Sequence, residues 1–159
     1  MHMPPSVPAS PHRRLVRLAL LVSVLILPAL AHAQSIPAAL RAAILLRSLQ
    51  YEKTFASGSG EATLLVLNGS GGGKDGAEVL GPLKQIAASG AAGRSLKVET
   101  SNSDAAAEET RKRAPAVIYV PSGNEGALAD LANVHGVVIM CGDPALVGRG
   151  CLLSVEAAG

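Results

Sequence analysis

Thr63-Leu64-Leu65-Val66-Leu67 is an apolar run in which polar and apolar residues do not alternate. Such a run is typical of a strand that is buried on both faces of a parallel sheet. Two similar runs follow, at residues 116–120 and 136–140. Residues 95–100 alternate apolar and charged side chains, which predicts a strand nearer the edge, and residues 151–155 form a fifth candidate strand.

Segments with helical spacing separate these strands. The first helix is predicted over residues 36 to about 55, and the Gly81-Pro82 pair predicts that Pro82 begins the second helix. A third is predicted over residues 104–113 with Ser103 as its N-cap, and a fourth after the capping-box pattern Ser122-Gly123-Asn124-Glu125. We therefore expect one α/β domain with a small, mostly parallel Rossmann-like or flavodoxin-like sheet and helices on both faces.

Residues 1–33 have the three zones of a secretory signal peptide. A basic stretch is followed by an apolar run over residues 18–27 and by small residues that end in Ala31-His32-Ala33. We expect cleavage after Ala33 and export to the periplasm of a single domain that spans residues 34–159. A retained membrane anchor is the alternative, which we disfavour because the apolar run is shorter than the roughly 20 residues of a membrane span.

Composition excludes some classes of protein and partner. Of the 159 residues, 48% are hydrophobic and 16% are charged, which is typical of a globular domain and not of a disordered chain. The formal net charge is +2 at pH 7, but loss of Arg13, Arg14 and Arg17 with the signal peptide would leave −1. No basic patch then remains, so we do not expect a nucleic-acid partner.

Asn68-Gly69-Ser70-Gly71-Gly72-Gly73-Lys74-Asp75 is a glycine-rich turn whose N–H groups could bind an anion. It is not a Walker A loop, which has glycine where Asn68 stands and serine or threonine where Asp75 stands. We favour a connector over a phosphate site. A small-ligand pocket at the carboxyl edge of the sheet stays open as an alternative. The residues that would form this ligand or partner loop are Gly69, Lys74, Asp143 and Arg149.

Cys141 and Cys151 are the only cysteines in the chain. In an oxidising compartment we expect a structural disulfide, which would contribute about 2–3 kcal/mol by closing the loop between them. Two free buried thiols, or a redox-active or intermolecular role, are the alternatives.

His135 is the only histidine outside the signal peptide, and its place at a predicted helix end favours a structural role. We identify no catalytic, metal or cofactor residues. An enzyme is the disfavoured class, for which Asp143 is the carboxylate to test.

The order of these segments resembles the YfiR family of exported bacterial proteins. The resemblance covers most of the chain after the signal peptide, and no single piece of it is a catalytic signature. It rests on the opening Ile-Pro-Ala-Ala-Leu-Arg-Ala-Ala at 36–43, on residues 64–67, 93–98 and 116–122, and on the closing stretch 137–155 with Gly142-Asp143-Pro144 and Gly148-Arg149-Gly150-Cys151.

The resemblance implies an exported regulatory protein without chemistry of its own. Members of the family repress a membrane diguanylate cyclase by binding its periplasmic sensor region, which sets the intracellular level of cyclic di-GMP. An outer-membrane lipoprotein relieves this repression. The resemblance further implies a homodimer, a disulfide and a chain that continues past the position of Gly159, so that the domain is either truncated there or completed by a partner. The alternative function is a periplasmic small-molecule binding module that uses the strand-end loops.

Overall fold

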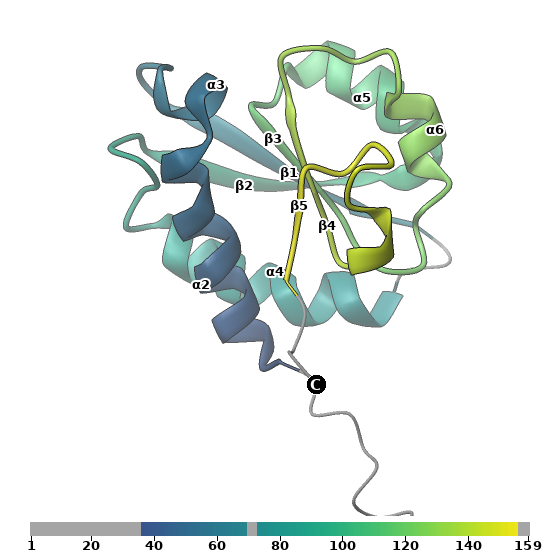
Figure 1. Cartoon of the computed structure of the whole chain (residues 1–159), viewed down its shortest axis with the longest axis horizontal. Helices are drawn as coiled ribbons and strands as arrows, with labels where there is room; N and C mark the ends of the chain where they lie inside the picture. Colours follow the sequence, from purple (N-terminus) through teal and green to yellow (C-terminus); the bar gives the residue numbers. More distant parts are fainter. Residues whose placement is uncertain (1–35, 70–72, 156–159) are drawn as a thin grey trace, which may run out of the picture. The chain divides into compact units, whose positions relative to one another are not determined.

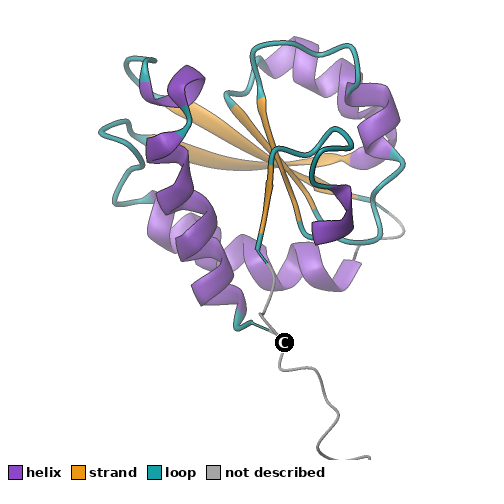
Figure 2. Cartoon of the chain, in the orientation of Figure 1, coloured by secondary structure: helices purple, strands orange, loops and turns teal. Residues whose placement is uncertain are grey.

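The computed structural model describes residues 36–69 and 73–155, and the predicted signal peptide lies outside them. The described residues form a layered α/β domain (Figures 1 and 2). In chain order the main elements are α2 (Ala38–Ser48), α3 (Lys53–Ala56), β1 (Ala62–Asn68), α4 (Gly73–Ala87), β2 (Leu96–Asn102), α5 (Ala106–Arg113), β3 (Val117–Val120), α6 (Ala127–Leu131), β4 (Val138–Cys141) and β5 (Leu153–Ser154). Short 3₁₀ turns lie at Leu49–Tyr51, Ser103–Ala105 and Pro144–Leu146.

The five strands form one parallel sheet in the order β2-β1-β3-β4-β5. The predicted fold class is therefore confirmed. β1 and β3 lie at its centre, with Leu64 opposite Val117. All four residues of β3 are buried, as are Leu64 to Leu67 of β1. The alternating segment became β2, which is an edge strand as its pattern predicts.

Helices cover both faces of the sheet, as expected. Leu64 and Val117 belong to a core that includes residues of α2, α3 and α4. Leu65 and Ile118 point to the opposite face and pack in a second core with residues of α6. Each fully buried leucine contributes roughly 1.5–3 kcal/mol relative to an exposed one, so the doubly covered strands dominate the stabilisation of this domain.

The first helix is shorter than predicted. α2 ends at Ser48, a 3₁₀ turn follows, and Glu52 then adopts an extended conformation before α3 begins. The Glu52 carboxylate accepts a hydrogen bond of 2.6 Å from the backbone N–H of Phe55. This bond satisfies an unpaired donor in the first turn of α3, so a new helix starts where the apolar spacing alone predicts a continuous one.

The second helix starts earlier than predicted, because Pro82 lies inside α4 and does not begin it. A proline usually excludes its predecessor from the helical region, since the proline ring collides with the Cβ of that residue. Here the predecessor is Gly81, which has no Cβ, and apart from its chain neighbours and the surrounding helix backbone no atom lies within 4 Å of where one would stand. The Gly81-Pro82 pair is therefore compatible with an uninterrupted helix.

Two predicted helix caps also differ from the structure. Asn102 caps the turn before α5, because its side chain accepts from the N–H of Asp104 at 3.1 Å. Ser103 is buried and donates instead to the side chain of Asn124 at 3.3 Å. The predicted capping box at residues 122–125 does not begin a helix. The Glu125 carboxylate accepts from the N–H of Gly123 within the loop, and α6 begins only at Ala127.

Arg94 fixes the loop that leads from α3 to β1. Its guanidinium donates to the carbonyl oxygens of Phe55, Ser59 and Gly60 at 3.1–3.4 Å. It also lies over the ring of Phe55, 5.0 Å from the centroid.

Within the described ranges, no helix has the length and apolar character needed to cross a membrane.

Candidate functional site

Asp75 is the centre of a polar cluster at the carboxyl edge of the sheet. It lies in the first turn of α4 and accepts hydrogen bonds from the hydroxyl of Tyr119 at 3.1 Å and from the N–H of Ser122 at 3.0 Å. It also forms an ion pair with Arg41 of α2. We call Arg41, Asp75, Tyr119 and Ser122 the Asp75 cluster. It joins two helices to the end of β3.

Burial and charge fix the protonation states in this cluster. Burial raises the pKa of Tyr119 above its ordinary value, and the negative charge of Asp75 raises it further. Burial acts to lower the pKa of Arg41, but the carboxylate of Asp75 and the contact with Tyr119 outweigh that effect and raise it. Tyr119 is therefore a neutral donor and Arg41 a cation. Asp75 thus accepts from two donors and pairs with one cation, and these contacts join α2, α4 and the end of β3.

The cluster occupies the position where open α/β sheets usually bind ligands. Successive strands lie on opposite sides of β1, so the topological switch point is at the carboxyl ends of β1 and β3. A Cβ atom on Gly142 would lie 2.7 Å from the N atom and 2.8 Å from the Oγ atom of Ser122, and would also meet Asp75. A Cβ atom on Gly69 would meet Ser103 and Asn124. Beside Gly142 and Gly69, the protein's own atoms thus occupy the space that a ligand group would need.

The four loop residues singled out from the sequence make separate contacts in the structure. Lys74 is exposed and its Nζ atom lies 3.8 Å from Glu78 of the same helix. Asp143 accepts from the N–H of Ala145 at 2.8 Å and so caps a 3₁₀ turn, while Arg149 is exposed. Gly69 packs beside Ser103, as described above. Among the described residues, none of the four is hydrogen-bonded or ion-paired to another.

Cys141 and Cys151 lie at disulfide-bonding distance, and their Cα atoms are 6.0 Å apart. Cys141 is the last residue of β4, and Cys151 stands two residues before β5. The pair therefore holds the loop 142–150 against the sheet. Both cysteines are buried in the core beneath α6.

An apolar groove runs beside β5, at the other edge of the sheet from β2. It has a volume of about 700 Å³ and is lined by residues of the 3₁₀ turn after α2, of α3, of β4 and of the segment that enters β5. We call it the β5 groove, and its apolar lining consists of Leu49, Tyr51, Val138, Leu152 and Leu153. Tyr51 is 78% exposed and Leu152 is 58% exposed. In the described part of the chain β5 pairs only with β4, so its outer edge is open.

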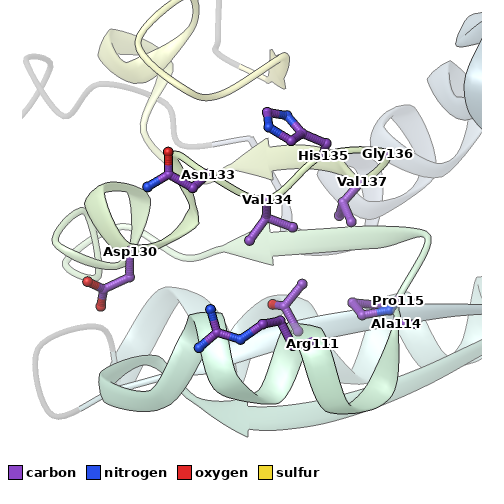
Figure 3. Close-up of a pocket in the computed structure, with 10 residues that line it drawn as sticks. Arg111, Ala114, Pro115, Asp130, Asn133, Val134, His135, Gly136 and Val137 are labelled. Atoms are coloured by element: carbon purple, nitrogen blue, oxygen red, sulfur yellow. The ribbon is translucent and has the colours of Figure 1, made fainter.

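A second hollow lies between α5 and α6, at the amino end of the strands, whereas the Asp75 cluster lies at their carboxyl end (Figure 3). Its volume is about 420 Å³. We call it the amino-edge pocket. His135 lines it and is exposed; because α6 ends at Leu131, this histidine lies beyond the helix and not at its end as predicted. Within the described ranges no group of three or more His, Cys, Asp or Glu side chains could hold a metal ion.

Sequence reasoning missed the Asp75 cluster and the β5 groove. Asp75 is 34 residues from Arg41 and 44 from Tyr119 in sequence, so no local spacing reveals their contact. One signal was present: Tyr119 interrupts an otherwise aliphatic buried run, and a buried tyrosine hydroxyl needs a partner. In the sequence, Tyr51 and Leu152 belong to apolar patterns that predict buried side chains. These patterns do not show that both side chains are exposed in the fold.

The fold and its topology define a small Rossmann-like α/β domain. Comparison of the chain with models of protein families, with curated proteins and with solved structures gave no match in any of the three.

Proposed function

We propose that this protein is an exported regulator that binds and represses a membrane signalling protein, a diguanylate cyclase, through the partner's periplasmic sensor region. The resemblance of the sequence to the YfiR family supports this activity and this partner. The observation that carries a binding role is the β5 groove, where apolar side chains surround an open strand edge.

The groove fits an extended segment of a partner protein. An open edge strand can pair with an added strand, whose main chain supplies hydrogen bonds and whose alternate side chains enter neighbouring hollows. Tyr51 and Leu152 flank such a hollow and leave more than half of their surface in water. Burial of aromatic and apolar side chains of this kind dominates the energetics of many interfaces.

The close packing beside Gly142 disfavours a small ligand at that point of the switch crevice. Asp75 and Ser122 already bond to each other there, and Gly142 leaves no room for a further group. A ligand at that position would have to displace a part-buried ion pair, which is costly.

The experiment measures intracellular cyclic di-GMP in the native organism. The gene is deleted and then restored as wild type, as the double variant Tyr51→Ser with Leu152→Ser, or as Leu40→Ser. Leu40 is the matched control because it is an apolar residue of α2 that is 52% exposed and lies outside the groove.

We expect deletion to raise cyclic di-GMP, and the wild type and Leu40→Ser to restore the low level. The groove variant should fail to do so although it is exported in the same amount. An unchanged level on deletion of an expressed gene would reject the regulatory function. Full restoration by the groove variant would reject the groove as the binding surface.

A further inference from the structure

The amino-edge pocket has two charged walls, and the rest of its lining mixes apolar and polar side chains. Arg111 of α5 and Asp130 of α6 line it from its two sides, as Figure 3 shows. Val134, Val137 and the buried Pro115 lie between and beneath them. The pocket thus presents one guanidinium and one carboxylate beside a small apolar surface, with the polar side chains of Asn133 and His135 also in its lining.

The two charges are not used elsewhere in the described part of the chain. Arg113, two residues after Arg111, pairs with Glu99 and Glu109 at 3.1 and 2.7 Å. Arg111 and Asp130 take part in no ion pair among the described residues, with each other or with a third group. The pocket therefore separates two opposite charges by more than contact distance and leaves both available.

This combination selects a ligand by its charge distribution. An anion would gain from Arg111 but would be repelled by Asp130, and a cation would meet the reverse situation. A molecule that carries both a carboxylate and an ammonium group would satisfy both walls with charge-assisted hydrogen bonds. The volume of about 420 Å³ lies near the lower end of the range for small-molecule sites, so the ligand is small.

We propose that the amino-edge pocket binds a small zwitterion with an apolar side chain, of the class of a free amino acid or a dipeptide. Arg111 would bind the carboxylate and Asp130 the ammonium group, while Val134 and Val137 would contact the side chain. This site lies at the opposite end of the strands from the Asp75 cluster, and it does not depend on the regulatory function proposed above.

Isothermal titration calorimetry on the purified protein tests the proposal. The probes are L-leucine, the dipeptide alanyl-leucine, and two fragments of leucine, isocaproate and isoamylamine, which lack the ammonium and the carboxylate group respectively. The variants are Arg111→Gln and Asp130→Asn. Lys112→Gln is the matched control, since Lys112 is an exposed cation next to Arg111 that does not line the pocket. Circular dichroism checks that every variant is folded.

We expect saturable binding of leucine, of the dipeptide or of both. The probe with the lower dissociation constant shows whether the pocket prefers a free amino acid or a dipeptide. Each pocket variant should weaken binding about tenfold or more, because each removes one charge-assisted hydrogen bond. Lys112→Gln should bind as the wild type does. A weak small-molecule site has a dissociation constant of about 1 mM, so a zwitterion at about 10 mM would saturate it. The proposal is wrong if neither zwitterion binds at that concentration. It is also wrong if a fragment binds as tightly as its zwitterion, or if the pocket variants bind unchanged.

Discussion

Replacement of Gly142 by alanine would place a methyl group in space that the Asp75 cluster already fills. The new Cβ atom would lie 2.7 Å from the backbone N atom of Ser122, which cannot rotate away as a side chain would. Either the strand end shifts, or the 3.0 Å hydrogen bond from Ser122 to Asp75 breaks. Overpacking of this kind costs about 1–3 kcal/mol, and loss of a hydrogen bond to a charged group costs about 1.5–3 kcal/mol.

Alanine also reduces the freedom of the unfolded chain, which offsets about 0.4–1 kcal/mol of this loss. We therefore expect Gly142→Ala to lower the free energy of unfolding by about 1–2.5 kcal/mol. Gly126→Ala is the matched control, because nothing lies within 4 Å of a Cβ atom there and its φ of −56° suits alanine. The control should be as stable as the wild type or slightly more stable.

Urea unfolding followed by circular dichroism measures both changes. With an m-value typical of a domain of this size, the midpoint of Gly142→Ala should fall by about 1–2 M relative to the wild type. A midpoint at or above that of the wild type would refute the reasoning. The crevice at the switch point would then have room for an added group, and a ligand there would become plausible.

Three other perturbations test the remaining features. Because burial raises the pKa of Tyr119, its contribution to stability is full below the ordinary tyrosine pKa of about 10 and is lost as the pH rises above it. Tyr119→Phe should therefore make alkaline unfolding less steep with pH, which urea titrations at several pH values above about 9 would measure. Arg94→Ala should lower the free energy of unfolding by about 1–2 kcal/mol in urea titrations, with only partial recovery in Arg94→Lys, because the ammonium group cannot reach three carbonyl oxygens at once. Joint replacement of Cys141 and Cys151 by serine should cost about 2–3 kcal/mol against the oxidised wild type, and reduction should lower the wild type to a similar midpoint.

The central strands could be predicted because their information is local. A run such as Leu64 to Leu67 has no polar face, so it must be buried on both sides, and this requires covering layers of helices. The edge position of β2 follows from the same reasoning, since Lys97 and Glu99 alternate with apolar residues and form an exposed ion pair of 2.7 Å in the structure. Fold class thus follows from the distribution of apolar residues alone.

Contacts between distant segments could not be predicted in this way. The position of Pro82 within α4 depends on a missing Cβ at Gly81, which a rule about proline alone overlooks. Asp75 was considered only as a residue that departs from a phosphate-binding motif, whereas its partners come from α2 and from the end of β3. A single sequence shows which side chains need partners and does not show which partners they find.

The shortness of β5 has a consequence for how the domain opens. Only two residues of β5 pair with β4, whereas β1 pairs along seven residues with β2. Amide hydrogens at Leu153 and Ser154 should therefore exchange with solvent through local fraying, at a free energy far below that of global unfolding. The covalent link at Cys151 keeps this fraying segment within reach of its place, so β5 can detach and re-pair repeatedly while the central strands stay intact.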